Sequence, residues 1–489
     1  MTPQTNDTQH KTVQSDSEQF QAEISGSCPH SADSFSKGQK KENNLGSDPI
    51  PALVRRLALP AMLAQFVNVL YSVIDRMYIG NIPVVGETAL AGVGICGPIV
   101  TMLSAFAAWV GIGGAPLMSI KMGQQDTKNA RKILANCFLM LTIMSGLLLF
   151  LCYVFKAPLL TAFGATETIF PYADTYMTVY LTGTFFSILS LGLNQFIICQ
   201  GFAKLGMFSV IIGAVCNIIL DSVFIFACDM GVAGAALATV LSQLASCLFT
   251  LWVLFSHRTP IGISFGNYNL RLCLKVLAVG LTPFLIILFD NILIIVQNVM
   301  LKNYGGSESD LLLTCNTIVQ SFMLLVTMPL SGITGGTQSI LGFNYGAGNN
   351  ERIKYAEKEI VKVALIFCTI LFLFAQFGSG LFVRIFTQDA LYIEKTVDFI
   401  KIYTLGIIPL AVQYTIVDGM TGMGIAKVAL PLSFFRKGVY IGLVVLFCIV
   451  FGAEYLFWAE PVSDVVSPIV SGAAFFILLP KVLLQSPDK

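Results

Sequence analysis

The chain has 489 residues, of which 55% are hydrophobic and only 12% are charged, and its formal net charge is +1. Soluble domains carry about 25% charged residues, so much of this protein's surface is expected to face lipid. The near-neutral charge and the lack of a basic stripe argue against nucleic-acid binding. The twelve cysteines are scattered through apolar runs without a CxxC pair, which predicts neither a disulfide framework nor a metal site, and no cofactor is expected.

Residues 1–49 differ from the rest of the chain. They are rich in Ser, Gln, Asp, Asn and Lys and show almost no apolar periodicity. Such a segment buries too little apolar surface to offset the entropy lost on folding. We predict a disordered tail, and the absence of an apolar run followed by a cleavage site argues against a signal peptide.

From residue 53 onward the chain is a succession of long apolar segments. A helix needs about 20 apolar residues to cross a bilayer, and a continuous rather than alternating apolar pattern argues against a β-barrel. The sequence therefore predicts an all-α membrane protein with twelve transmembrane helices. The expected spans are 57–79, 89–118, 133–155, 172–200, 205–227, 232–256, 273–301, 311–341, 360–386, 399–425, 432–454 and 466–484.

The orientation follows from where lysine and arginine gather. Most of them lie in the loops on the same side as the tail, for example Lys121, Lys128, Arg352 and Lys427. Because cytoplasmic loops are enriched in these residues, we expect both termini to be cytoplasmic in a multi-pass protein of the plasma (inner) membrane.

The chain also repeats itself with an offset of 223 residues. This offset aligns Pro60 with Pro283 and Gly201 with Gly424, and it aligns the loop SIKMGQQDTKNAR with LGFNYGAGNNERIK. A repeat of six spans gives two halves with the same membrane orientation, which is typical of transporters that bind substrate between halves. We predict two pseudo-symmetric six-helix bundles, a lobe of residues 50–262 and a lobe of residues 263–489.

Ionisable side chains at membrane depth indicate function, because burying one there costs about 2.5–3.5 kcal/mol. Asp221 lies inside the fifth span, and Asn217 shares its helix face four residues earlier. Asp75 in span one, Asn194 in span four and Thr239 in span six are further polar groups at depth. Carboxylate and amide oxygens suit a proton or Na⁺, although a structural hydrogen-bond network between helices would use the same residue types.

The repeat makes the first half distinctive. Asp75 aligns with Asn298, Asn217 with Tyr440 and Asp221 with Val444, so the second half lacks this set. We interpret this asymmetry as a cation site in the first half alone.

Three other positions are also candidates for a functional role. Asp290 in span seven and Asp418 in span ten are candidates for contacts to a cationic substrate or a second proton, or for inter-helix hydrogen bonds. Pro60 can kink the first helix, as a moving part or as a static bend.

Several segments resemble the multidrug and toxic compound extrusion (MATE) transporters, and the likeness covers nearly everything after the tail. They are ALPAMLAQFVNVLYSVIDRMYIG, SIKMGQQDTKNARKIL, LNQFIICQGFAK, and AVCNIILDSVFIF followed by GVAGAALATVLSQ. The DinF-like and MepA-like prokaryotic branch is the most similar. The resemblance implies a MATE-type fold of two six-helix bundles around a V-shaped cleft, with a cation site in the first lobe. It places that site at Asp75, Asn194, Asn217, Asp221 and Thr239, and it makes Pro60 the bend of helix one.

The expected function is secondary active export of small, often cationic drugs or metabolites by antiport against H⁺ or Na⁺, by a monomer in the lipid bilayer. The alternative is a flippase for lipid-linked oligosaccharides from the same superfamily. Such a protein favours a cleft lined with basic residues, for which Arg436 and Lys437 are the candidates. An intramembrane enzyme is not expected, because the chain has no GxSxG motif, no HExxH motif and no histidine at depth.

Overall fold

A computed structural model describes residues 44–83, 85–163, 165–256 and 258–484. Within these ranges the regular elements are helices, and no strand is present. Twelve helical segments of the described chain are long and apolar enough to cross a membrane, from Ile50–Gly80 to Ala453–Pro480. The expected all-α fold with twelve membrane-crossing helices is therefore confirmed.

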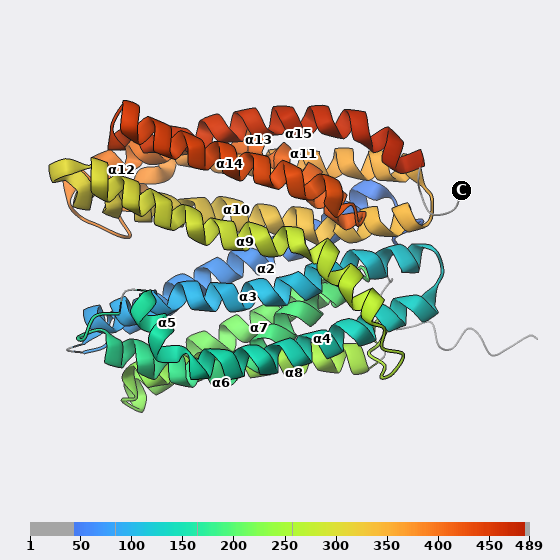
Figure 1. Ribbon diagram of the computed structural model, residues 1–489, viewed down its shortest axis with the longest axis horizontal. Helices are drawn as coiled ribbons and strands as arrows, with labels where there is room; N and C mark the ends of the chain where they lie inside the picture. Colours follow the sequence, from blue (N-terminus) through green and yellow to red (C-terminus); the bar gives the residue numbers. More distant parts are fainter. Residues whose placement is uncertain (1–43, 84, 164, 257, 485–489) are drawn as a thin grey trace, which may run out of the picture. The chain divides into compact units, whose positions relative to one another are not determined.

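The first six spans use helices α2 to α8. Their bounds are α2 Ile50–Gly80, α3 Gly86–Gly123, α4 Thr127–Val154, α5 Lys156–Ala162, α6 Phe170–Ile198, α7 Ala203–Asp221, η1 Ser222–Ala227 and α8 Gly231–Phe255. The short α5 was not predicted, and η1 is a π-helical continuation of α7. Figure 1 shows this set in blue to green.

The second six spans use helices α9 to α15, drawn in yellow to red in Figure 1. Their bounds are α9 Leu270–Tyr304, η2 Gly306–Glu308, α10 Ser309–Gly346, α11 Asn350–Val383, α12 Ala390–Tyr403, η3 Thr404–Gly406, α13 Ile407–Gly422, α14 Ala426–Val450, η4 Ala453–Trp458 and α15 Ala459–Leu484. The tenth span, predicted as one helix, consists of α12 and α13 joined by the 3-10 turn η3.

The helices pack as two lobes, α2–α8 and α9–α15, in agreement with the repeat. Within the first lobe α6 packs against α3 and α8, and α2 against α7, while in the second α9 packs against α14 and α10 against α13. Apolar side chains also cover the outside of the bundle, where Phe377 is 86% exposed and Phe476 79%. Surfaces of this kind are stable in a lipid environment rather than in water.

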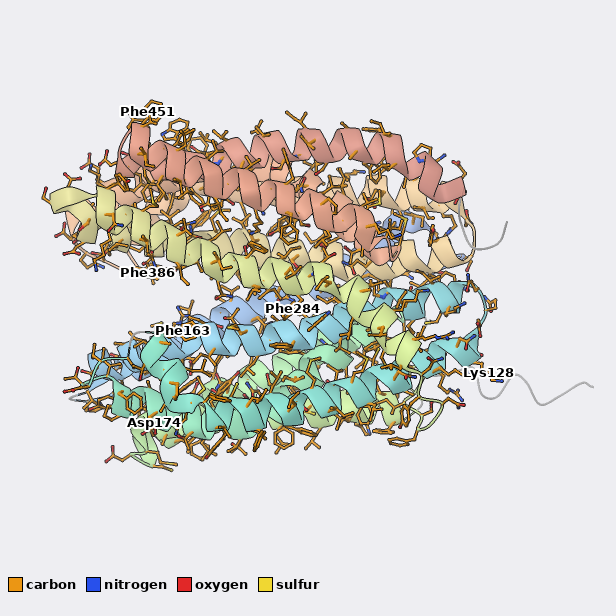
Figure 2. All side chains as sticks on the ribbon, viewed as in Figure 1. Lys128, Phe163, Asp174, Phe284, Phe386 and Phe451 are labelled. Atoms are coloured by element: carbon orange, nitrogen blue, oxygen red, sulfur yellow. The ribbon has the colours of Figure 1, made fainter. Side chains whose placement is uncertain are left out.

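Figure 2 shows Lys128 at one end of the bundle and Asp174 and Phe451 at the other. We call the first the basic end, and it holds the loops after α3 and α10. Its basic residues include Lys121, Lys128, Arg352, Lys354 and Lys427.

The lobes meet in the half of the bundle nearer the basic end, where α2 packs against α10 and α3 against α9. Glycines allow this close approach. A Cβ on Gly280 would lie 1.8 Å from the carbonyl oxygen of Trp109, and one on Gly332 would lie 2.7 Å from that of Ala61. The Trp109 indole donates a 2.8 Å hydrogen bond to the Leu277 carbonyl and stacks on Phe284 at 4.5 Å.

This contact gives a first prediction. Gly280→Ala should separate the lobes at the basic end, because the added methyl group would overlap the backbone of α3. Electron-spin distance measurements between labels on α3 and α9, in a cysteine-free background, should report a longer mean distance. Gly97→Ala on α3 is the matched control, since a Cβ there meets nothing within 4 Å. An unchanged distance in Gly280→Ala would show that the lobes do not depend on this contact.

The last residues of the predicted tail are folded, which differs from the expectation of disorder up to residue 49. Leu45 is buried, and its carbonyl accepts hydrogen bonds from Asn344 and Arg352 at 3.1 and 3.3 Å. Arg352 also donates to the Asp48 carbonyl at 2.8 Å. The remainder of the predicted tail, residues 1–43, lies outside the described residues, and the predicted lobe boundary at 262 and 263 stays a prediction.

Candidate functional site

Two aspartates from different helices of the first lobe face each other. Asp75 lies on α2, and Asp221 is the last residue of α7 and fully buried. The two carboxyl groups are close enough to interact electrostatically. Asp75 Oδ1 and both oxygens of Asp221 are buried and accept no hydrogen bond from any donor in the described chain. Two carboxylates placed in this way need a proton or another cation between them to offset repulsion and lost hydration.

The backbone beside Asp221 is irregular. The π-helical turn Ser222–Ala227 follows it directly, and Cys228 N–H bonds back to the Val223 carbonyl at 2.9 Å. Single π-turns within α-helices occur frequently at functional sites, and this one shifts the register of the helix at the carboxylate.

Asn217 and Thr239 link α7 to α8 next to Asp221, and their part in a cation site stays a prediction. Asn217 lies one turn before Asp221 on α7, and its amide donates to the Thr239 hydroxyl on α8 at 3.4 Å. Thr239 in turn donates to the Ala235 carbonyl at 3.0 Å. Asn217 Oδ1 is buried without a donor in the described residues. The site therefore presents further oxygen atoms that can accept a hydrogen bond from a protonated carboxyl group or coordinate Na⁺.

Sequence reasoning missed three tyrosines near the pair. Tyr71 precedes Asp75 by one turn of α2, and its hydroxyl is within electrostatic range of both aspartates. Tyr176 on α6 is within range of Asp75, and its ring stacks on Tyr180 at 5.8 Å. The i, i+4 spacing of each pair was visible in the sequence, but only the packing of α7 against α2 and α6 shows which face they share.

The prediction that Asn194 belongs to this cluster is wrong. Asn194 lies near the end of α6, and its amide donates to the Gly206 carbonyl at the start of α7 at 3.4 Å. Gly206 precedes Asp221 by fifteen residues on the same helix, which is roughly 22 Å along the helix axis. Asn194 therefore links the α6–α7 hairpin near the basic end and does not join the aspartates.

The second lobe carries neutral groups at the equivalent place. The hydroxyl groups of Tyr440 and Tyr403 share a 2.7 Å hydrogen bond. The side-chain amide of Gln297 also donates to the Tyr440 hydroxyl. Asn316 donates to Gln297 at 3.2 Å and to Asn298 at 3.4 Å. This network of amides and hydroxyls largely satisfies itself, whereas the aspartate pair of the first lobe does not. The asymmetry seen in the sequence is thus also an asymmetry of hydrogen-bond satisfaction.

The two acidic candidates of the second lobe have partners of their own. Asp290 on α9 forms an ion pair with Lys437 on α14, and Asp418 on α13 accepts a hydrogen bond from Thr334 on α10. Neither lies with the Asp75–Asp221 pair, because both belong to the other lobe.

Arg436 is the centre of a buried ionic cluster that the sequence did not reveal. It is 8% exposed, and it donates to Glu460 at 2.8 Å and to Asp464 at 2.9 Å. Both deep basic residues of the second lobe, Arg436 and Lys437, are therefore engaged by carboxylates.

Pro60 lies within α2, which the structure assigns as helical without interruption on both sides of it. The neighbouring Ala61 is the residue that Gly332 and Gly336 of α10 approach most closely. Pro60 is thus adjacent to the lobe contact, and its role as the bend of helix one stays a prediction.

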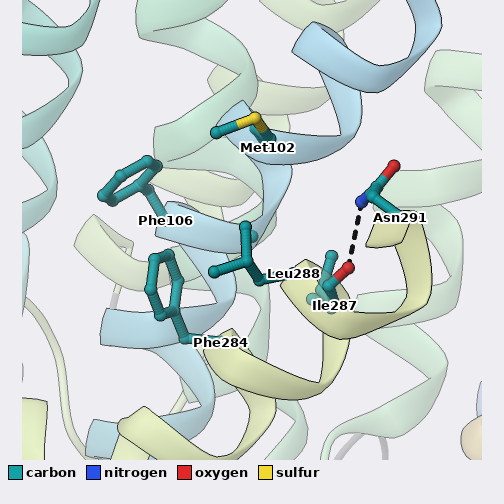
Figure 3. Close-up of a pocket in the computed structure, with 7 residues that line it drawn as sticks. Met102, Phe106, Phe284, Ile287, Leu288 and Asn291 are labelled. Carbon is teal, nitrogen blue, oxygen red and sulfur yellow. Dashed lines mark hydrogen bonds between the residues drawn. The ribbon is translucent and has the colours of Figure 1, made fainter. Parts of the chain in front are cut away.

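A small apolar pocket lies between the lobes, beside the Trp109–Phe284 stack. Figure 3 shows Met102 and Phe106 of α3 facing Phe284, Leu288 and Asn291 of α9. The amide of Asn291 donates to the Ile287 carbonyl of its own helix at 2.9 Å. The phenyl rings of Phe106 and Phe284 lie 5.1 Å apart. The lining of this pocket is thus mainly apolar and aromatic, and it is contributed by both lobes.

Two repeated lobes of six membrane-crossing segments, with ionisable groups buried inside them, are typical of membrane transporters. The family model described as MatE matches residues 60–223 and 284–446, and the chain belongs to this family. The resemblance seen in the sequence is thereby confirmed. Membership of a transporter family also confirms that the chain is not an enzyme.

Curated relatives cover most of the chain. The multidrug export protein MepA of Staphylococcus aureus (strain N315) is 20% identical over 449 residues, which are 90% of this chain and 96% of that protein. MepA of Staphylococcus saprophyticus is 20% identical over 442 residues, 88% of this chain and 94% of that protein.

Solved structures share the fold. A structure described as the outward-facing conformation of a multidrug resistance MATE family transporter of the MOP superfamily has a TM-score of 0.84 and 22% identity, covering 91% of this chain and 99% of that chain. A MATE structure in a bent conformation has a TM-score of 0.82 and 22% identity, covering 90% and 97%.

Proposed function

We propose that this protein is a secondary active multidrug exporter that couples the export of organic, often cationic compounds to the entry of H⁺ or Na⁺. The observation that carries the proposal is the Asp75–Asp221 pair, whose buried oxygens lack donors among the described residues. Asp75, Asn217, Asp221 and Thr239 would bind the coupling cation.

The coupling would depend on a change in the conformation of α2 that cation binding favours. The pair joins α2 to α7, and the first turns of α2 pack in the apolar core of the other lobe through Leu53, Val54 and Leu57. A cation that binds the pair more tightly in one arrangement of α2 shifts the protein toward that arrangement. Cation binding in the first lobe would therefore change how the lobes meet and which side the substrate can reach.

The described conformation supports an outward-open state in this cycle. The lobes are joined near the basic end, and with both termini cytoplasmic this end is the cytoplasmic side. In this orientation the aspartate pair lies toward the outer ends of α2 and α7, the side from which a coupling cation would enter. The relatives' names as multidrug export proteins support a small-molecule substrate.

A flippase for lipid-linked oligosaccharides is less consistent with the structure. Such a substrate carries a pyrophosphate group, which needs free basic side chains in the binding region. Arg436 is held by Glu460 and Asp464, and Lys437 by Asp290.

The test is efflux from proteoliposomes that contain the purified protein and a fluorescent organic cation, with pH and Na⁺ gradients imposed separately. When the coupling cation, H⁺ or Na⁺, flows into the liposome down its gradient, the dye should move from the lumen to the external solution. Dissipating the gradient of that cation should stop the dye movement. Dye movement that is indifferent to both gradients would contradict cation-coupled antiport.

A further inference from the structure

A second group of buried carboxylates lies where α10, α11 and α13 meet in the second lobe. Glu357 on α11 is 6% exposed, and neither of its carboxylate oxygens has a hydrogen-bond partner in the described chain. The carboxylate lies over Gly419 of α13, where an added Cβ would come within 2.8 Å of Oε1 and 2.9 Å of Oε2. The charge of Asp418, the residue before Gly419, reaches Glu357.

No positive charge of the surrounding described residues forms an ion pair with either carboxylate. Asp418 accepts its hydrogen bond from the neutral Thr334, and Tyr414 is a further titratable group within range of Asp418.

The basic residues of the helices packed around the pair are directed elsewhere. Arg55 and Arg352 donate to the backbone carbonyls of Pro51 and Asp48, and Lys358 and Lys427 are exposed. The others are engaged by other carboxylates: Arg56 by Asp48, Lys354 by Glu351, Lys362 by Glu359, Arg436 by Glu460 and Asp464, and Lys437 by Asp290.

The repeat shows that the scaffold does not need an acid at this place. The offset that aligns the lobes places Leu134 of α4 opposite Glu357, and Leu134 is fully buried in an apolar core. Asp418 aligns with Gln195 and Thr334 with Gly111. An apolar residue thus fills the equivalent position in the first lobe, whereas the second lobe buries a carboxylate without a partner in the described chain, which is costly unless a cation joins it.

The Glu357–Asp418 pair lies on the side of α10 opposite to the contact between the lobes. Gly332 and Gly336 of α10 approach α2 at Ala61 and Leu57. Thr334 lies midway between them in sequence, about 200° around the helix, and faces Asp418 on the other side. Helix α10 is therefore held between the first helix of the other lobe and the carboxylate pair.

We propose that Glu357, Asp418 and Thr334 form a second site for a small monovalent cation, a proton or Na⁺, in the lobe that lacks the Asp75–Asp221 pair. The proposal rests on the proposed function only in that the protein works in a cation gradient. A bound cation removes the repulsion between the two carboxylates and stabilises the packing of α10 on α13. Occupation of the site thereby favours the arrangement in which the lobes are joined near the basic end.

The experiment measures thermal stability of the purified protein in lipid nanodiscs, with Asp75→Asn and Asp221→Asn introduced together so that the first-lobe pair no longer binds a cation. One arm raises Na⁺ at constant pH and ionic strength, and the other lowers pH without Na⁺. A ligand that binds the folded state raises stability with its concentration. We expect a rise in Tm with Na⁺ or with protons, and the arm that shows it identifies the ion.

Glu357→Gln in the same background should lose that dependence, because the amide is neutral at every pH and a weak ligand, with the apparent cation affinity falling at least about tenfold. Glu351→Gln on the exposed start of the same helix is the matched control and should retain it. Thr334→Val is a second variant for the case in which Glu357→Gln does not fold, and it should weaken the dependence of Tm on the cation. A dependence that survives Glu357→Gln, or its absence from the parent background, would overturn the proposal. Because this readout is binding and not transport, it is separate from the test of coupled export.

Discussion

Asp221→Asn should reduce cation-driven export to the level of protein-free liposomes while leaving the protein folded. The substitution keeps the size of the side chain, so the packing of α2 against α7 is preserved. It removes one of the two negative charges between which the coupling cation would lie. Export from proteoliposomes under the driving gradient, with the protein's melting temperature measured in parallel, checks both halves of this expectation.

Matched variants make the result specific to the pair. Asp75→Asn should give the same loss, and Asn217→Ala a partial one, because the amide is one of several ligands. Asp174→Asn is the control, since this aspartate forms a half-exposed ion pair with Lys156 at 2.8 Å at the start of α6. Full coupled export by Asp221→Asn would contradict the assignment of the cation to this pair.

Asn194 provides a further control, because its hydrogen bond places it away from the aspartates. Since Asn194 bonds to the start of α7 near Gly206, Asn194→Ala should leave the cation dependence of export unchanged. Its effect should be confined to stability, at about 0.5–1.5 kcal/mol for one lost hydrogen bond. If Asn194→Ala changed the cation concentration that gives half-maximal export, Asn194 would have to be assigned to the cation site after all.

The parts of the site that the sequence could predict are those set by distance along one helix. Asn217 and Asp221 share a face because four residues make about one helical turn. The placement of Asp75 and Thr239 beside them depended on the family resemblance, since helix periodicity does not say which helices touch.

The failure at Asn194 has a simple geometric reason. Two helices joined by a short connection run antiparallel, so a residue near the end of α6 meets the beginning of α7 rather than its end. Asn194 lies four residues before the end of α6, and Gly206 lies three residues after the start of α7. The spacing along the sequence is therefore enough to exclude Asn194 from the site, because the depth of each residue must be counted from the loop that the two helices share.

Glu357 was missed for a different reason. It lies in NNERIKYAEKEIVK, a stretch with alternating charges that is typical of a solvated helix start. Its burial depends on Gly419, whose missing side chain leaves room for the carboxylate, and on the packing of α11 against α13. The Arg436 cluster was likewise hidden, because Glu460 and Asp464 precede the predicted start of the last span, whereas the structure begins α15 at Ala459.

The second large effect is expected at Arg436, on stability rather than on coupling. Its guanidinium is the shared partner of Glu460 and Asp464, and Asp464 is fully buried. Arg436→Ala would leave two buried carboxylates without a counter-charge, and breaking a buried ion pair in this way costs about 3–5 kcal/mol. The melting temperature in nanodiscs should fall far below that of the parent protein.

A rescue variant distinguishes lost charge balance from lost packing. Arg436→Met combined with Glu460→Gln and Asp464→Asn removes all three charges while keeping similar volumes, and it should recover most of the stability, because replacing a buried ionic group as a whole is often neutral. Lys354→Ala is the surface control, since its ion pair with Glu351 is exposed and such pairs contribute at most about 1 kcal/mol. If the triple variant is as unstable as Arg436→Ala, the cluster stabilises the lobe through its shape and hydrogen bonds, and the explanation by unpaired charge fails.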